Sequence, residues 1–231
     1  MNIQEKTYII LGQRLLSGFD SKMLVDWAVR LLVSGHESES LIILAGLDSE
    51  STEEREKYFW KSIAELDIII TLTDSELVEY FVQKVANDVV KGNRKTSSGL
   101  NIMRDVLAWS GYDSKYLQFL ELEEDVDYLE NYGSVIFNSG LNKSNKEQFI
   151  KDEFDLFLEI QRLKIDEETK QNAFCADCNK IAKPILRTKY QLKKPFKYQT
   201  WFCGNCGSEN VEHFSTQNGK RKIIDRIKNN P

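Results

Sequence analysis

The first two thirds of the chain place apolar residues at the spacing of amphipathic helices. Leu24, Trp27 and Leu31 share one helix face, and Gly35 follows where such a helix would end. Polar sequences typical of helix starts precede three more apolar stripes. They are Ser51-Thr52-Glu53-Glu54, Thr73-Asp74-Ser75-Glu76 and Ser144-Asn145-Lys146-Glu147. The pattern predicts an irregular multi-helix domain. Within it, the short runs 68–72 and 134–137 leave the choice between helix and strand open.

The periodicity changes to that of β-strands near the C-terminal end. Residues 165–172 contain one large apolar side chain, Ile165, and predict a linker. Beyond it, residues 186–192 and 196–202 alternate apolar and polar positions around Pro195. This alternation predicts a β-hairpin with one packed face and one basic, solvated face. The fold class is therefore mainly α, with a small β module after the helices.

The composition is that of an ordinary globular protein. Of the 231 residues, 41% are hydrophobic and 29% are charged, so the chain can form one substantial core and a smaller module. The longest apolar run, Leu41 to Leu47, is far shorter than the roughly 20 residues of a membrane-spanning helix. Neither a membrane segment nor a secretory signal is visible, so the predicted location is the cytoplasm and no membrane partner is expected.

Charge divides the chain into two parts. Residues 1–164 carry 18 Lys and Arg against 29 Asp and Glu, a net charge of −11, whereas residues 165–231 carry 13 against 7, a net charge of +6. A shift of this size indicates segments with different partners. The predicted organisation is an acidic helical domain (1–164), a linker (165–172), a β module (173–214) and a basic tail (215–231), part of which can form a short helix.

The four cysteines form two Cys-x-x-Cys pairs. Cys175 and Cys178 make up the first pair, and Cys203 and Cys206 the second. Each pair can direct two thiolates at one cation from a tight turn, and the intervening hairpin can bring the two pairs together. The sequence therefore predicts that all four cysteines bind one metal ion.

Residues 173–214 resemble the zinc ribbon family, most clearly in Cys203-Gly204-Asn205-Cys206-Gly207. Asn179 and Gly207 follow the two pairs, and both tolerate the positive φ that such turns need. The resemblance implies one structural Zn²⁺ in a closed site. An iron centre of the rubredoxin type and a thioredoxin-type redox pair are the alternatives. With the thiols occupied, no catalytic residue is predicted.

Cationic and aromatic residues are interleaved along the hairpin and recur as cations in the tail. This combination suits nucleic-acid backbones and unstacked bases. The positions predicted to contact nucleic acid or another partner are Arg187, Lys189, Lys193, Lys194, Lys197, Tyr198, Trp201, Lys220, Arg221 and Lys222. The other interpretation is structural, because ribbons also serve as docking elements and small cores need aromatic side chains.

A further resemblance covers about residues 20–70. Asp26-Trp27-Ala28-Val29-Arg30-Leu31-Leu32 and Leu44-Ala45-Gly46-Leu47 resemble a helical segment of small bacterial proteins, some associated with toxin immunity or defence. The resemblance implies a protein-binding role and carries no catalytic residue. Arg30 and His36 also resemble the Arg-x5-His pattern of the HEPN ribonucleases, although Leu31 stands where that family prefers a polar residue.

The sequence therefore favours a non-catalytic protein that binds a macromolecule. The helical domain is predicted to bind a protein partner. The alternative is nucleic-acid binding through the ribbon and the tail, and a HEPN-like ribonuclease is a third hypothesis. The acidic run within residues 121–130 is interpreted as a solvated helix face, with a surface for a basic partner as its alternative.

Overall fold

The computed structural model describes residues 2–229, which are mainly α-helical with a small antiparallel β part, and this confirms the predicted fold class. The helices are α1 (Ile3–Arg14), α2 (Lys22–Val33), α3 (Glu39–Ala45), α4 (Thr52–Glu65), α5 (Asp74–Val90), α6 (Thr96–Trp109), α7 (Ser114–Tyr132), α8 (Lys146–Leu163), α9 (Glu167–Lys170) and α10 (Gln217–Asn229). The strands are β1 (Ala173–Cys175), β2 (Lys180–Ala182), β3 (Pro184–Tyr190), β4 (Lys197–Cys203) and β5 (Val211–His213). Among the described helices, none has both the length and the apolar character needed to cross a membrane.

The chain divides into two compact units, residues 1–123 and residues 124–231, and the division falls inside α7. The charge pattern and periodicity place it after residue 164 instead. The difference lies in α8, which belongs to the second unit because its apolar face packs on α10.

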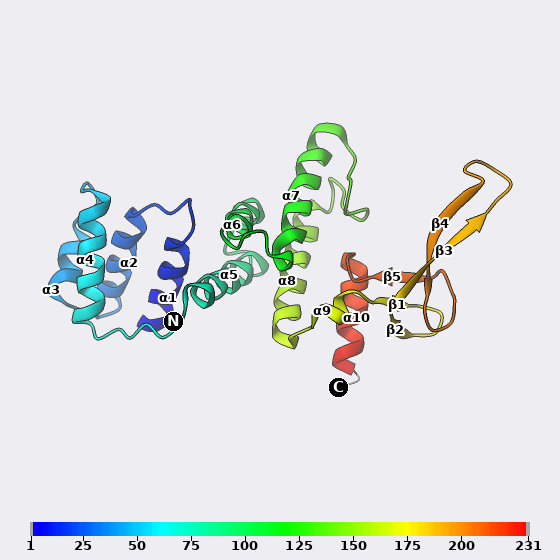
Figure 1. The fold of residues 1–231 in the computed structure, drawn as a ribbon. Coiled ribbons are helices and arrows are strands. Elements are labelled where there is room, and N and C mark those ends of the chain that lie inside the picture. Colours follow the sequence, from blue (N-terminus) through cyan, green and yellow to red (C-terminus); the bar gives the residue numbers. More distant parts are fainter. Residues whose placement is uncertain (1, 230–231) are drawn as a thin grey trace. The chain divides into compact units, whose positions relative to one another are not determined.

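In the first unit, α2, α3 and α4 pack around a common apolar core (Figure 1). Leu24, Leu31 and Phe59 are fully buried there. The ring of Trp27 meets that of Phe59 edge-on, with 4.9 Å between the ring centroids. These residues occupy the positions that the helical periodicity assigns to apolar faces, so burial of those faces holds the helices in place.

Two of the three predicted helix starts form side-chain caps. Thr73 and Glu76 exchange hydrogen bonds in a complete capping box at α5, and Ser51 Oγ accepts from the Glu54 amide at α4. The third prediction is wrong in its detail. The residue before α8 is Asn145, and its side chain makes no capping hydrogen bond.

The two runs that could be helix or strand are neither. Residues 68–72 connect α4 to α5, and residues 134–137 follow α7, without regular secondary structure. The second run is held by Asp125 of α7. The buried carboxylate of Asp125 accepts hydrogen bonds from the backbone amides of residues 136–138. These amides are satisfied by a side chain, and a partner strand is not required.

The second unit joins helices and strands around one apolar core. Its members are Leu156, Ile160, Phe214, Ile223 and Ile224, bordered by Leu163, Ile165, Phe174, Ile181 and Ile227. The predicted linker contains α9, and its Ile165 lies against this core. The predicted basic tail forms α10, which packs on α8 and β5. Strands and helices of this unit therefore stabilise one another.

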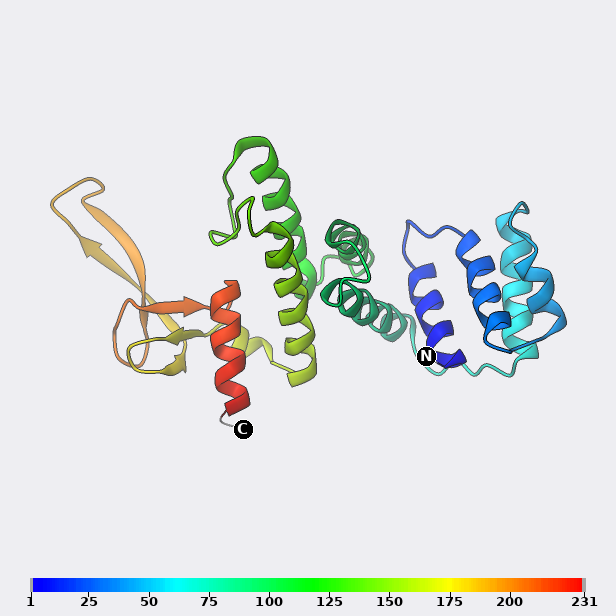
Figure 2. The same cartoon turned by 180° about the vertical axis from the view of Figure 1, so that it is seen from behind.

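The strands are all antiparallel. β1 lies between β2 and β5 in a three-stranded sheet, and β3 pairs only with β4. The β3–β4 hairpin extends away from the three-stranded sheet of the same unit (Figures 1 and 2).

The predicted hairpin is present, but the predicted separation into a packed face and a basic face is wrong. Tyr190 pairs with Lys197, and Leu186 pairs with Trp201. Side chains of paired residues project to the same face, so each face carries the apolar positions of one strand and the polar positions of the other. A register one residue away would have aligned the apolar sets.

Candidate metal centre and the hairpin it anchors

The four cysteines gather at the base of the hairpin, with all four Sγ atoms within 4.8 Å of one another. Cys175 and Cys206 have their Sγ atoms 3.6 Å apart, and Cys178 and Cys203 have theirs 3.7 Å apart. These distances exclude disulfides, which need about 2.05 Å, and all four thiols are free. Four sulfurs bound at about 2.3 Å to one tetrahedral Zn²⁺ lie about 3.8 Å from each other. The cluster therefore has the donors and the spacing to hold one metal ion.

Two tight turns place the sulfurs. Asn179 has a φ of 54° and Gly207 a φ of 77°, the left-handed conformation predicted after each cysteine pair. Gly204 lies too close to the backbone of Lys183 for a larger residue, a constraint that the sequence does not reveal. A Cβ at this position would lie 2.4 Å from the carbonyl oxygen of Lys183, so glycine lets the second turn lie against the start of β3.

Asp177 links the two turns. Its carboxylate accepts hydrogen bonds from Ser208 Oγ at 2.5 Å and from Asn210 Nδ2 at 2.9 Å, both beyond the second cysteine pair. The same hydrogen bonds lower the pKa of Asp177 below its ordinary value. Asp177 is not among the sequence-predicted site residues. The available signal was its place between the two cysteines of the first pair, together with Ser208 and Asn210 after the second pair.

The surroundings of Cys203 and Cys206 shift the pKa values of these two thiols in opposite directions. Burial raises the pKa of the Cys203 thiol, but the backbone amides of Cys206 and Asn205 donate to it, and its pKa falls to about 7. The Ser208 amide lowers the pKa of Cys206, whereas desolvation and the neighbouring thiols raise it to about 12. Neighbouring thiolates repel one another. A divalent cation among the sulfurs would offset that repulsion and favour the deprotonated thiols.

Large apolar side chains are exposed along the hairpin and at its tip. They are Ile185, Leu186, Tyr190, Leu192, Phe196 and Trp201. Leu192 is 99% exposed and Tyr190 is 77% exposed. An isolated pair of strands, each about 24 Å long, has no second layer against which to bury its side chains. Leu186, Tyr190 and Trp201 share one face of the hairpin, whereas Ile185 lies on the other. Exposed apolar side chains gathered on one face are typical of interaction sites.

The predicted contact residues Arg187, Lys189 and Tyr198, within the paired strands, are partly engaged. Lys189 pairs with Glu209, with 2.5 Å between Nζ and Oε1. Arg187 and Lys189 both lie over the ring of Phe202, 5.4 and 5.5 Å from its centroid. Tyr198, on the same face, is half-buried. This face is therefore covered in large part by its own side chains.

The tip carries the available positive charge. Lys193, Lys194 and Lys197 are exposed, and within residues 2–229 none of the three forms an ion pair. Residues 183–203 contain six Lys or Arg and no Asp or Glu. Cations gathered at one end of the hairpin, without anions among residues 183–203, attract polyanions.

The tail residues are engaged within the second unit, which corrects part of the predicted contact set. Lys220 is 5% exposed and pairs with the buried carboxylate of Glu153. Lys222 pairs with Glu212 at 3.3 Å. A helix packed on its own unit leaves Lys220 unable to reach a partner, whereas an extended tail would have left it free.

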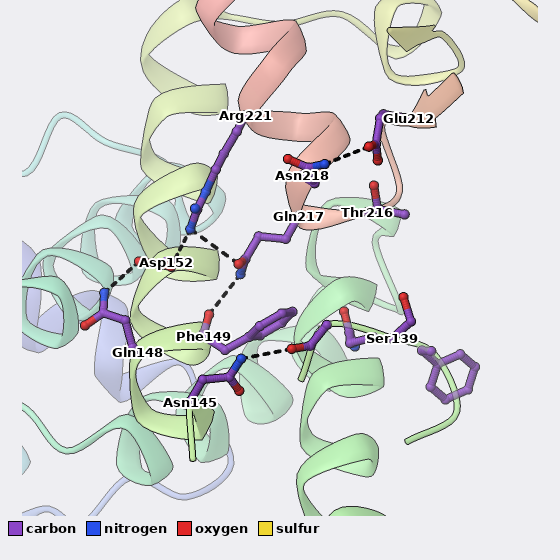
Figure 3. A pocket seen from close by; sticks show the side chains of 13 residues that line it. Ser139, Asn145, Gln148, Phe149, Asp152, Glu212, Thr216, Gln217, Asn218 and Arg221 are labelled. Carbon is purple, nitrogen blue, oxygen red and sulfur yellow. Dashed lines mark hydrogen bonds and ion pairs between the residues drawn. The ribbon is translucent and has the colours of Figure 1, made fainter. Parts of the chain in front are cut away.

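Arg221 lies in the wall of a pocket of about 490 Å³ formed by loop 137–140 and the starts of α8 and α10 (Figure 3). Its guanidinium pairs with Asp152, and Gln217 Nε2 donates to the carbonyl oxygen of Phe149 at 3.0 Å. These polar groups of the pocket bond to one another, so we assign it no function of its own.

The geometry gives the HEPN hypothesis no support. α2 ends at Val33, and Gly35 takes a φ of 83°, as predicted for the end of this helix. Arg30 is exposed on the last turn of α2, whereas His36 lies beyond the helix. Within the described part of the chain no hydrogen bond joins the two side chains.

The acidic run of residues 121–130 lies on α7 and is not one uniform surface. Asp125 is buried. Glu123 pairs with Arg104 at 2.7 Å. The remaining acidic side chains of the run are exposed, which leaves the interpretation as a solvated helix face in place for them.

No protein-family model, curated protein or solved structure matches this chain. The resemblance of residues 20–70 to immunity-associated proteins therefore rests on those residues alone. The resemblance of residues 173–214 to zinc ribbons has one further support, the clustering of the four cysteines.

Proposed function

We propose that this protein is a non-catalytic nucleic-acid-binding protein. In this proposal one Zn²⁺, held by Cys175, Cys178, Cys203 and Cys206, fixes the base of the β3–β4 hairpin. The hairpin then serves as an arm that contacts the nucleic acid. The observation that carries the proposal is the exposed hairpin of residues 183–203, which combines six cations, no anions and a row of uncovered apolar side chains.

Zinc is the proposed metal because a closed set of four thiolates in two Cys-x-x-Cys turns is typical of structural zinc. Its role here is mechanical. Cys203 ends β4 and pairs with Pro184 at the start of β3, so the ion would hold both strands at their common base. Iron could occupy the same ligands, and metal analysis of the purified protein distinguishes the two.

A second function, protein binding by the first unit, is favoured by apolar side chains exposed on two packed helices. Val29 and Val33 lie one turn apart on α2, and Ile42 lies on α3; all three are exposed. A co-purified protein partner lost in Val33→Asp and retained in a Lys193→Asp variant would support this function. Full binding of that partner by Val33→Asp would contradict it.

The proposed function is tested by removing charge from the tip of the hairpin. The variant Lys193→Gln, Lys194→Gln, Lys197→Gln is titrated with a labelled mixture of oligonucleotides at several salt concentrations. We expect its affinity to fall at least about tenfold at low salt, because three phosphate contacts are lost. The negative slope of log K against log salt should become shallower by about 2, because fewer counterions are released.

The matched control is Lys91→Gln, Lys95→Gln, Lys143→Gln, which removes the same charge from exposed positions elsewhere. It should bind as the wild type does. Failure of the wild-type protein to bind any oligonucleotide at about 50 mM salt would contradict the proposed function. Equal losses in the two triple variants would contradict the role of the hairpin.

A further inference from the structure

We propose that the hairpin is built for single-stranded nucleic acid, RNA or DNA, in preference to a double helix. This inference rests on the proposed function and specifies its ligand. It is carried by the distribution of aromatic rings between the two faces of the hairpin.

One face presents its rings to solvent. Tyr190 and Trp201 lie on this face together with Lys197 and Leu186, as the register of β3 and β4 requires. Tyr190 is directly opposite Lys197, so an exposed ring and an exposed cation lie side by side. The rings of Trp201 and His213 meet in a T-shaped contact, with 5.3 Å between their centroids, and Trp201 remains 43% exposed.

The opposite face offers less to a ligand. Its Phe202 ring already has the cations of Arg187 and Lys189 over it, and Lys189 is tied to Glu209. At the tip, Phe196 is exposed, and so are Lys193, Lys194 and Lys197. A strand lying along the open face toward the tip would meet the ring of Trp201 first and then the ring of Tyr190 with Lys197 beside it.

Rings exposed in this way suit bases that are free to unstack. In a single strand each base can stack on an aromatic side chain while its phosphate meets a neighbouring cation. In a duplex the bases are already stacked on each other. A two-stranded ribbon that enters the major groove reads base edges through hydrogen bonds. Thr188, Gln199 and Lys197 of the open face have groups for this purpose, but Tyr190 and Trp201 of the same face present exposed rings suited to stacking.

The test compares one sequence as single-stranded RNA, single-stranded DNA and duplex DNA, each titrated with the zinc-loaded full chain at the same salt concentration. We expect at least about tenfold tighter binding of a single strand than of the duplex. Tyr190→Ala and Trp201→Ala should each weaken single-strand binding by about 5- to 150-fold and leave duplex binding unchanged. A preference for RNA or for DNA identifies the sugar, and either supports the inference.

Two controls separate the effect on binding from an effect on folding. Tyr132→Ala removes a similarly exposed ring from α7 and should change nothing. Because Trp201 is close to Cys203, the zinc content of Trp201→Ala is measured, whereas Tyr190 lies at the far end of the strand pair. Equal or tighter duplex binding, or unchanged single-strand affinity in Tyr190→Ala, overturns the inference but leaves the proposed function standing. Binding to none of the three ligands overturns both.

Discussion

The carboxylate of Asp125 holds the chain where it leaves α7. It accepts hydrogen bonds from the amides of Ile136 at 2.5 Å and Asn138 at 2.6 Å, and from the Asn138 side chain at 2.9 Å. Burial raises the pKa of this carboxyl, but the hydrogen bonds lower it by more, so that its pKa lies below the ordinary value. Such a group stabilises the fold above the pKa of the unfolded chain, about 3.9. That stability is lost as the pH falls through the folded pKa.

Replacing Asp125 by Asn should therefore cost about 2 kcal/mol at pH 7, because a charged acceptor is lost and the new amide faces backbone donors. Urea unfolding of the variant and the wild type measures the difference. The difference in unfolding free energy should begin to shrink as the pH falls below about 4, where the carboxyl of the unfolded chain takes up its proton. It should vanish once the pH falls below the lower pKa of the folded state. Asp127→Asn, exposed on the same helix, is the control. A difference that stays constant down to acidic pH would show that the carboxylate charge is not the cause.

The burial of Lys220 cannot be predicted from composition alone. Counted with Arg221 and Lys222, it belongs to a basic tail, yet it is buried and paired with Glu153. The apolar stripe of Ile223 and Ile224 explains the difference, because a helix that buries those residues also carries Lys220 inward. A count of charges does not show which side of the helix Lys220 occupies. The helical spacing of Lys220, Ile223 and Ile224 does show it, because it places all three on one face.

At the scale of elements, the existence of the hairpin was predictable and its register was not. Alternating residues predict strands, but register depends on where the turn closes, and here the loop of residues 191–196 sets it. The usual assumption that one face is buried fails because the face with Leu186, Tyr190 and Trp201 leaves these large side chains exposed. The prediction of a packed face was an error of this kind.

The close contact between α10 and β5 can be tested by a single substitution. A Cβ on Gly219 would lie 1.9 Å from the carbonyl oxygen of His213. Ala favours a helix by about 1 kcal/mol over Gly, but the overlap involves backbone and forces α10 away from β5. We expect Gly219→Ala to destabilise the second unit by about 1–3 kcal/mol.

Hydrogen exchange of the β5 and α10 amides measures this effect, since weaker docking speeds their exchange. Asp225→Ala is the matched control, because it adds Ala to an exposed position of the same helix. It should leave exchange unchanged or slow it. Slower exchange in Gly219→Ala would mean that helix propensity outweighs the contact.

In the whole molecule, the fold class and the clustering of the four cysteines could be predicted from the sequence, whereas the division into units could not. Helical periodicity and Cys-x-x-Cys spacing are local signals that can be recognised within a short stretch of sequence. The division into two units depends on which helices pack their apolar faces against each other. α8 carries the same kind of stripe as the helices of the first unit, yet its Leu156 and Ile160 pack against Ile223 and Ile224 of α10.

The shared core of the second unit also changes what metal removal should do. Phe174 and Ile181 of the strands lie against the core formed by α8 and α10. Loss of the metal should therefore loosen α10 together with the strands, because the ion supplies folding energy to a module with few buried residues. The first unit has its own core and should keep its helical signal.

A metal-held hairpin that binds nucleic acid is tested by one titration of a labelled single-stranded oligonucleotide with the protein before and after chelation, with the metal content measured in both samples. We expect one Zn²⁺ per chain, loss of binding on its removal with the helices of the first unit retained, and recovery with one equivalent of Zn²⁺. Undiminished binding by protein shown to be free of metal would contradict this expectation.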